Sequence, residues 1–251
     1  MPSIRDARAT LRAGAPAPLE AAGAVTAPLV SFAGVSAGYG EGRVLERLDL
    51  AIAPGELVFL VGRSGAGKST ILRLLTGECR PDAGQVLVEG RDIGALPARD
   101  LPAHRRRLGI VFQDAKLLPR RTIAENVAFP LEVDGAAPGE IAHEVARSLA
   151  AVGVEHLAHR YPHQVSGGER SRAAFARAIV ARPALVIADE PTGDLDPLTA
   201  YDIAEVLKSL NATGTTLLVA THAMEIVSAL GRRVVALAGG RIVSDGPAGD
   251  R

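Results

Sequence analysis

The stretch from Gly62 to Thr70, GRSGAGKST, combines glycines, a lysine and hydroxyl side chains at a spacing that suits phosphate binding. It fits the pattern of a glycine, four further residues, and then glycine, lysine and serine or threonine. In such a loop, backbone N–H groups surround the phosphates of a nucleotide, and Lys68 places its charge between the β- and γ-phosphates. Ser69 can ligate Mg²⁺, and Thr70 is suited to the α-phosphate. The residues predicted to bind the phosphates are Gly62, Arg63, Ser64, Gly65, Ala66, Gly67, Lys68, Ser69 and Thr70.

This loop is flanked by the two elements that must position it. The run before it, LVFLVG at residues 57 to 62, is continuously apolar, which is typical of a strand buried on both faces. The run after it, ILRLLTG, has apolar residues at helical spacing and ends in glycine. Strand, loop and helix therefore follow in the required order, which disfavours the alternative of a glycine-rich turn before an ordinary helix.

Two more apolar runs end in side chains that suit the same chemistry. ALVIADEP, residues 184 to 191, leads to Asp189, a predicted Mg²⁺ ligand, and to Glu190, which can orient or polarise the water that attacks the γ-phosphate. TTLLVATH, residues 215 to 222, delivers His222, which can contact the γ-phosphate or hold that water. The alternatives, two solvated acids and a structural histidine, are weaker beside a phosphate loop. We therefore predict Glu190 and His222 as catalytic residues.

A glutamine ends a third apolar run, LGIVFQD at residues 108 to 114. The amide oxygen of Gln113 can ligate Mg²⁺ or contact the attacking water, so Gln113 is a third predicted catalytic residue and a third predicted metal ligand. From about residue 115 to 182 the periodicity becomes helical, which predicts a helical insertion between two strands of the sheet.

Within that insertion, VSGGERSRAAFARA at residues 165 to 178 raises a separate question. Ser166 and Glu169 have the spacing of a capping box, which predicts a helix that begins here. Gly167 and Gly168 would be its first residues, although glycine costs up to about 1 kcal/mol relative to alanine inside a helix. The capping box accounts for the serine and the glutamate, but it leaves the two glycines unexplained.

Composition limits the classes of function. The chain has 251 residues, a formal net charge of zero and 47% hydrophobic residues, so it can bury one large core or two modest ones and lacks the basic character of a nucleic-acid binder. Cys79 is the only cysteine, which excludes an internal disulfide, and we expect it to be a small buried apolar residue.

No run is long and apolar enough for a membrane span, and no signal peptide opens the sequence, so we expect a soluble cytoplasmic protein. Residues 1 to 28, rich in Ala, Pro, Gly and Arg, are predicted to be a disordered arm that precedes one domain at residues 29 to 251.

Taken together, these motifs resemble those of the ATP-binding subunits of ABC transporters, over about residues 29 to 245. In family order they are Tyr39, GRSGAGKST, Gln113, SGGE at residues 166 to 169, LVIADE, GDLD ending in Asp196, and THA with His222. The resemblance implies an α/β fold: a P-loop NTPase core sheet of RecA-like type, with an antiparallel β subdomain and an inserted α-helical subdomain. It implies an ATPase that uses ATP and Mg²⁺, with Tyr39 stacked on adenine and Asp196 at the nucleotide interface.

The resemblance also answers the question of the glycines. Family members form head-to-tail homodimers in which Ser166, Gly167, Gly168 and Glu169 of one subunit would cover the γ-phosphate held by the other. An anion is favourable at a helix N-terminus, and glycine permits close approach.

Within the family the motifs look most like the cell-division ATPases of the FtsE type. These work with the integral membrane protein FtsX at the cytoplasmic face of the inner membrane, and the pair is thought to control cell-wall hydrolases. Two alternatives remain: the ATPase of a lipoprotein-releasing, efflux or importer system, and an ATP-dependent scaffold with little turnover. The sequence departs from common family residues at Arg170, Asp194 and Ala223, and none of these is a predicted phosphate or metal ligand.

Overall fold

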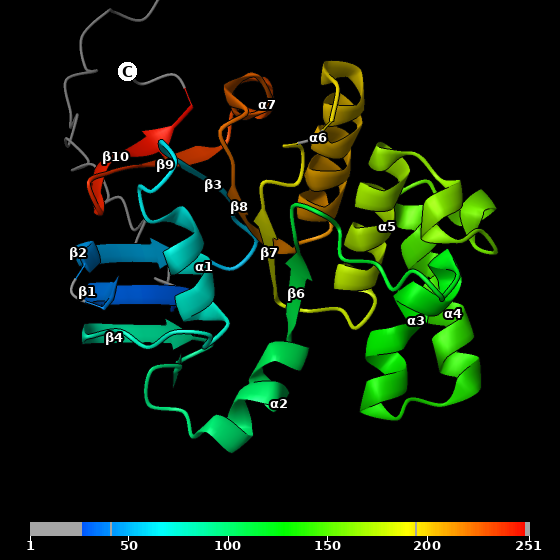
Figure 1. Cartoon of the computed structure of the whole chain (residues 1–251), viewed down its shortest axis with the longest axis horizontal. Coiled ribbons are helices and arrows are strands. Elements are labelled where there is room, and N and C mark those ends of the chain that lie inside the picture. The colour runs from blue at the N-terminus through cyan, green and yellow to red at the C-terminus, as the bar shows by residue number, and fades with distance from the viewer. Residues whose placement is uncertain (1–26, 41, 194, 249–251) are drawn as a thin grey trace, which may run out of the picture.

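The structure is a computed structural model that describes residues 27–40, 42–193 and 195–248. Most of the arm predicted for residues 1 to 28, and Asp194, lie outside the described residues. The described chain forms two sheets with helices around them (Figure 1).

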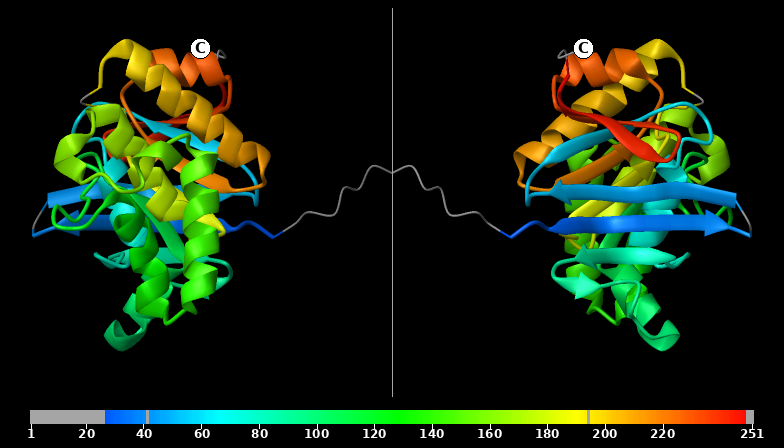
Figure 2. Two further views of the ribbon diagram at one scale, coloured as in Figure 1. Left: turned by 90° about the vertical axis from the view of Figure 1, so that its right-hand side faces the viewer. Right: turned by 90° about the vertical axis from the view of Figure 1, so that its left-hand side faces the viewer.

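The smaller sheet has four antiparallel strands in the order β2-β1-β4-β5. Its strands are β1 (Val30–Tyr39), β2 (Gly42–Ile52), β4 (Ala83–Val88) and β5 (Arg91–Asp92). Over its second half β2 alternates buried and exposed residues, because one face of this sheet packs on the core and the other meets solvent. β1 and β2 lie side by side across the face seen on the right of Figure 2.

The larger sheet has six strands in the order β10-β9-β3-β8-β7-β6. Its strands are β3 (Leu57–Val61), β6 (Leu108–Val111), β7 (Leu185–Asp189), β8 (Thr216–Ala220), β9 (Arg233–Ala238) and β10 (Arg241–Pro247). Every neighbouring pair is parallel except β9 and β10. The carboxyl ends of β3, β7 and β8 therefore meet at one edge, where ligands of parallel α/β sheets bind.

Seven α-helices connect and cover these strands within the described chain: α1 (Lys68–Leu75), α2 (Leu101–Arg106), α3 (Ile123–Asp134), α4 (Pro138–Ala151), α5 (Gly167–Ile179), α6 (Pro197–Ala212) and α7 (Met224–Leu230). Helices α3, α4 and α5 lie between β6 and β7 in the sequence, on the side of the larger sheet away from the smaller one (Figure 1). Helix α5 packs against β6, α3, α4 and α6, so it joins the helical layer to the main sheet. None of the helices described is long and apolar enough to cross a bilayer.

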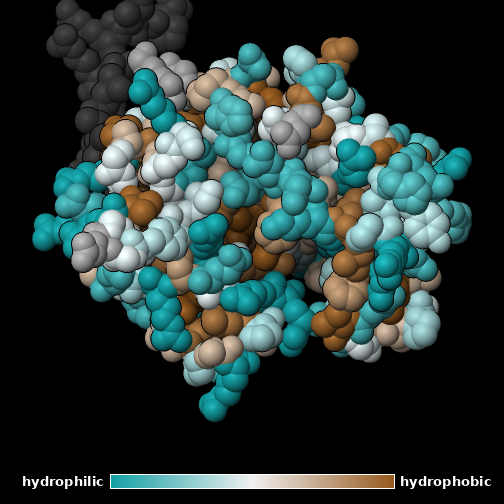
Figure 3. Space-filling view, in the orientation of Figure 1, coloured by the Kyte–Doolittle hydropathy of each residue, from teal (hydrophilic) through white to brown (hydrophobic). Residues whose placement is uncertain are grey.

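Each face of the larger sheet packs into its own apolar core. Along β3 the side chains alternate: Leu57, Phe59 and Val61 join the core formed with α3 to α6, whereas Val58 and Leu60 join the core formed with α1 and the smaller sheet. A strand buried on both faces must be apolar at every position, which is why LVFLV is uninterrupted. In the space-filling view, hydrophilic residues cover most of the visible surface, and apolar residues show mainly in its hollows (Figure 3).

Residues 83 to 106 hold β4, β5 and α2, which the sequence pattern does not predict. The first three residues of β4 are exposed and α2 has only six residues, so neither has a clear periodicity. His104 on α2 is buried, with Nε2 2.7 Å from the carbonyl oxygen of Leu75. Cys79, expected to be buried, is partly exposed instead.

Candidate active site

One cavity of about 790 Å³ brings together the side chains that the sequence separates by up to 183 residues, from Tyr39 to His222. It lies where β3, β7 and β8 end and α1 begins. It is lined by Tyr39, Val44, Gly62, Arg63, Ser64, Gly65, Ala66, Gly67, Lys68, Ser69, Thr70, Gln113, Asp189, Glu190 and His222. Apart from Val44, these are all residues that the sequence analysis predicts to act on a nucleotide.

Two of the three glycines of the phosphate loop, Gly62 and Gly67, are required by packing as well as by phosphate approach. A Cβ on Gly67, whose φ is 109°, would lie 2.5 Å from Cδ2 of Leu45, and a Cβ on Gly62 would lie 2.6 Å from the carbonyl oxygen of Leu237. Helix α1 starts directly after Gly67, and no side chain caps its first N–H groups. These N–H groups face a cavity that can take an anion.

Lys68, Glu190 and His222 form a connected polar group in this cavity. The Nζ of Lys68 donates a hydrogen bond to the carbonyl oxygen of Gly62 at 2.8 Å and lies 3.7 Å from Oε1 of Glu190. The other carboxylate oxygen, Oε2, accepts the backbone N–H of His222 at 3.1 Å and lies 2.8 Å from Nδ1 of its ring. The Glu190 side chain is only 15% exposed, whereas that of His222 is 67% exposed. Glu190 is thus fixed, and His222 faces open space.

The backbone of Glu190 directs its carboxylate to this position. Its φ is 47°, in the left-handed region that a non-glycine residue enters at a cost of about 1–3 kcal/mol. Its N–H donates to the carbonyl oxygen of Ala220 on β8 at 2.8 Å, while Asp189 ends β7 just before it. Because of this turn, the two consecutive acids need not point the same way, and Glu190 reaches towards the end of β8.

Asp189 has the surroundings of a cation ligand. Burial raises the pKa of Asp189 above its usual value; the neighbouring charge of Glu190 raises it further, and a hydrogen bond with Ser69 opposes the shift. The oxygens of Ser69, Gln113 and Asp189 line the same cavity, and such neutral and anionic oxygens are what Mg²⁺ prefers. No group of three or more His, Cys, Asp or Glu side chains suited to a metal is found in the described ranges, so substrate oxygens and water would have to complete the coordination.

Tyr39 lines the cavity and is 47% exposed. The guanidinium of Arg73 on α1 lies 5.9 Å from the ring centroid and donates to the phenolic oxygen at 3.3 Å. The ring can therefore offer a flat surface to a base while its edge is held. Neither Arg73 nor Val44 carries a motif that would have identified it from sequence.

The residues Ser166 to Glu169 lie elsewhere. The capping box is present, with the N–H of Glu169 donating to Oγ of Ser166 at 3.3 Å and the N–H of Ser166 donating to Oε2 of Glu169 at 2.7 Å. Asp196 caps α6 in a similar way, because its Oδ1 accepts the N–H groups of Leu198 and Thr199 at 3.1 Å each. Neither segment is part of the lining of the cavity that holds the phosphate loop.

Packing within the chain explains one of the two glycines. A Cβ on Gly168 would lie 2.1 Å from Cγ2 of Thr199, at the start of α6. Thr199 cannot rotate away cheaply, because its hydroxyl donates to Oδ2 of Asp196 at 2.5 Å. At Gly167 the nearest atom is the flexible end of Leu195, at 3.3 Å. Gly168 is therefore needed for the contact between α5 and α6, whereas Gly167 is not. This packing is a second reason for glycine at position 168, besides the close approach to a partner's phosphate that the family resemblance implies.

Gly168→Ala should destabilise the protein by about 1–2 kcal/mol, because the overpacking outweighs the gain of up to about 1 kcal/mol for alanine over glycine in a helix. Thr199→Ser removes the clashing methyl and keeps the hydroxyl, so the double variant should regain most of the lost stability. Urea unfolding monitored by circular dichroism measures both. Gly167→Ala is the matched control, and a loss of stability at Gly167 as large as that at Gly168 would contradict the packing explanation.

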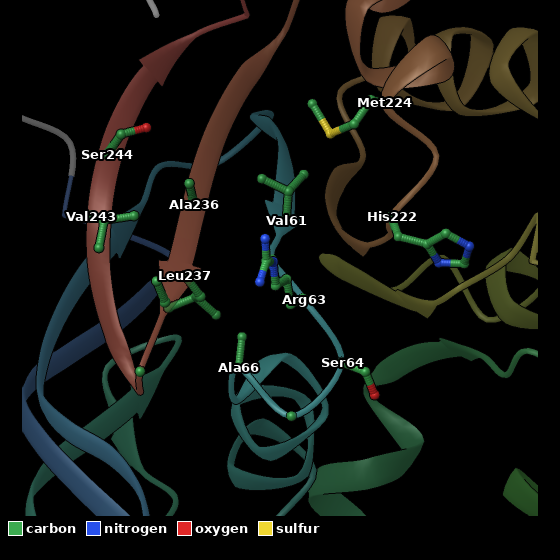
Figure 4. Close-up of a pocket in the computed structure, with 14 residues that line it drawn as sticks. Val61, Arg63, Ser64, Ala66, His222, Met224, Ala236, Leu237, Val243 and Ser244 are labelled. Atoms are coloured by element: carbon green, nitrogen blue, oxygen red, sulfur yellow. The ribbon is translucent and has the colours of Figure 1, made fainter.

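A second, more apolar hollow of about 730 Å³ adjoins the site (Figure 4). It shares residues 62 to 66 and His222 with the first cavity and extends to Met224 on α7 and Val243 on β10. Arg63 lies in its middle, between Leu237 and His222 (Figure 4). Met224 and Val243 are 39% and 62% exposed, so apolar surface lies open directly beside the phosphate loop.

Comparison with known sequences gives a consistent result. Residues 45–193 match the family model described as ABC transporter. The chain is 45% identical to the cell division ATP-binding protein FtsE of Bacillus subtilis, over 83% of this chain and 91% of that protein. It is 43% identical to the methionine import ATP-binding protein MetN of Mesorhizobium japonicum, over 83% of this chain but only 58% of that protein.

Solved structures that resemble this chain are also of ABC cassettes. The dimeric structure of MJ0796, a bacterial ABC transporter cassette, superposes with a TM-score of 0.78 at 32% identity, over 87% of this chain and 98% of that one. A second structure of MJ0796, described as a dimeric post-hydrolysis state bound to ADP and Pi, gives a TM-score of 0.77 at 32% identity and the same coverage.

Proposed function

This chain belongs to the ABC transporter family and is an ATPase with the family's P-loop fold, and from that premise we propose that its cavity hydrolyses ATP to drive a membrane partner. We further propose that residues 29 to 251 form one ATP-binding domain, with the helical insertion at about 115 to 182. The observation that carries the proposal is the convergence of Lys68, Glu190 and His222 at the ends of β3, β7 and β8.

In the proposed reaction, a water molecule attacks the γ-phosphorus, and the bond to the bridging oxygen of ADP breaks. Lys68 neutralises charge on the β- and γ-phosphates, while the α1 N-terminus and loop N–H groups bind the remaining oxygens. Glu190 orients the water and accepts its proton, and its contact with His222 fixes the carboxylate. His222, exposed at the cavity, contacts the γ-phosphate, and Gln113 contacts the water.

We assign Ser69, Gln113 and Asp189 as the residues that hold Mg²⁺. The ion supplies charge stabilisation for the phosphates when it is bound. Ser69, at the start of α1, and Asp189, at the end of β7, line the same cavity, so two elements bring the pair together.

The completed site is proposed to need a second copy of the chain. Ser166 to Glu169 and Asp196 lie outside the cavity lining, so they can serve a nucleotide only across an interface. The apolar hollow beside the phosphate loop offers surface that such an interface would bury, and the similar MJ0796 cassette is described as dimeric. We therefore propose an ATP-dependent head-to-tail homodimer that hydrolysis releases.

We propose an FtsE-like role, in which the dimer lies at the cytoplasmic face of the inner membrane and acts on an FtsX-like subunit that regulates cell-wall hydrolysis. The 45% identity to FtsE over nearly the whole of that protein supports this choice. The 43% identity to MetN favours an importer ATPase as the second candidate, although that match spans 58% of the importer protein. Efflux, lipoprotein release and a scaffold with little turnover are left as outcomes of the test.

The test is affinity capture of tagged Glu190→Gln protein from detergent-solubilised native membranes with ATP and Mg²⁺, with mass spectrometry of the membrane proteins that co-purify. Lys68→Ala protein is the control, because it should capture no nucleotide-dependent partner. A four-span protein with one large extracytoplasmic domain, together with division or cell-wall enzymes, supports the FtsE-like role. A many-span partner with a solute receptor favours the importer, and a membrane partner with a lipoprotein carrier, or a many-span partner without a receptor, favours lipoprotein release or efflux. Capture of no membrane protein contradicts all of these and favours the scaffold.

A further inference from the structure

The segment just after Gln113 has a backbone that it would not adopt by itself. Ala115 and Lys116 are consecutive non-glycine residues with φ values of 59° and 42°, both in the left-handed region. Side chains other than glycine are disfavoured there, so something outside the segment must hold it. The segment's own turn bonds, from the N–H of Ala115 to Phe112 and from that of Lys116 to Asp114, do not remove this strain.

Arg177 of α5 holds this segment with both ends of its guanidinium. NH1 donates to the carbonyl oxygen of Lys116 and NH2 donates to that of Ala115, each at 2.8 Å. Burial lowers the pKa of Arg177 below its usual value. Among the described residues, these two carbonyl groups are the hydrogen-bond partners of the Arg177 guanidinium. A planar guanidinium that bridges two successive carbonyls fixes their relative orientation.

The far end of the same loop is held by α3. Asn126 is fully buried; its Oδ1 accepts the N–H of Leu118 at 2.6 Å, and its Nδ2 donates to the carbonyl oxygen of Leu118 at 3.1 Å. Residues 115 to 118 are therefore pinned from two different helices. Only the clamp by Arg177 lies at the strained residues next to Gln113.

The strained residues also lie close to the proposed metal ligands. Phe112 and Lys116 line a small cavity of about 160 Å³ together with Ser69 and Asp189. Lys116 is fixed there as well, because its Nζ lies 4.4 Å from the centroid of the Phe112 ring. If Ala115 and Lys116 relaxed to ordinary backbone angles, Phe112 and Gln113 would move with them.

We propose that Arg177 is a positioning residue that holds Gln113 at the nucleotide cavity and ties it to helix α5. Arg177 lies eleven positions after Ser166, or about 16 Å along a helix. A shift of α5 at its N-terminus is therefore transmitted as a rigid displacement to the carbonyls beside Gln113. This inference rests on the proposed roles of Gln113 and of the α5 N-terminus, and it adds a connection between them.

The chain offers a matched control for Arg177. Arg105 of α2 makes the same kind of clamp, because its Nε donates to the carbonyl oxygen of Thr76 at 2.8 Å and its NH2 donates to that of Gly77 at 3.2 Å. That clamp holds the end of α1 and does not line the nucleotide cavity. Arg177→Gln and Arg105→Gln thus remove equivalent hydrogen bonds at different places.

The experiment combines amide hydrogen exchange of the peptide covering residues 112 to 118 with steady-state ATPase kinetics on the full chain. Arg177→Gln should speed amide exchange in this peptide at least about tenfold. It should also lower kcat about tenfold or more. KM for ATP should change less than about threefold, because the phosphate loop is untouched. Arg105→Gln should leave both unchanged, and Arg177→Lys should give intermediate exchange because one ammonium cannot bridge both carbonyls in the same geometry.

Unchanged exchange at residues 112 to 118 in Arg177→Gln would overturn the proposal, as would equal losses of kcat in the two glutamine variants. Gln113→Ala is assayed in parallel to separate this inference from the function on which it rests. If Gln113→Ala hydrolyses ATP like the unaltered protein, the role of Gln113 fails, while the exchange measurement still decides whether Arg177 holds the loop.

Discussion

Glu190→Gln should lower kcat for ATP at least about 100-fold, which is the range expected when a general base is removed. The variant should still bind ATP, and at least as tightly as the unaltered protein. The Glu190 carboxylate lies 3.7 Å from Nζ of Lys68, where it would compete with phosphate for that charge. A neutral amide removes the competition but cannot accept the proton of water. With ATP bound and hydrolysis blocked, the proposed dimer should accumulate, which light scattering after gel filtration detects.

Glu225→Gln is the control for charge, because Glu225 is an exposed residue of α7 and its removal changes net charge by the same amount. It should leave turnover within about twofold, as expected of a surface substitution. Turnover close to normal in Glu190→Gln would assign proton acceptance to another group. A large loss of ATP affinity would instead mean that Glu190 supports the phosphate loop.

The elements that carry the site were predictable because each is defined by local sequence. The apolar runs that lead to Gly62, Asp189 and His222 correspond to β3, β7 and β8. Strands buried on both faces can be recognised from residue type alone, and parallel strands bring their carboxyl ends to one edge. Membership of the ABC family, and the fold that goes with it, followed from the order of the motifs.

Other features depend on residues that are distant in sequence. Nothing near Gly168 indicates that Thr199 would leave no room for a Cβ, and nothing near Gln113 indicates that Arg177 would bind the next two carbonyls. The left-handed φ of Glu190 is equally invisible, because glutamate has no preference for that region. Such positions are held by tertiary contacts against local preference, and this explains why motifs identified the acids but not how they point.

Lys68→Ala should weaken ATP binding at least about 100-fold in calorimetry, since a charge-assisted contact with phosphate contributes about 3 kcal/mol. Lys68 is buried, with only 9% of its surface exposed, so water cannot replace its charge at the phosphates. Lys208→Ala removes an exposed lysine from α6 and should leave affinity unchanged.

A second variant separates the charge of Lys68 from its structural contacts. Loss of Lys68 leaves the Glu190 carboxylate, 15% exposed, without its nearby cation, and the remaining negative charge would itself repel ATP. Lys68→Ala combined with Glu190→Gln removes that repulsion. If the double variant still binds ATP weakly, the lost affinity belongs to the direct contact between Lys68 and phosphate. If it binds like the unaltered protein, the phosphates are held by the loop and α1 N–H groups alone, and Lys68 serves mainly to neutralise Glu190.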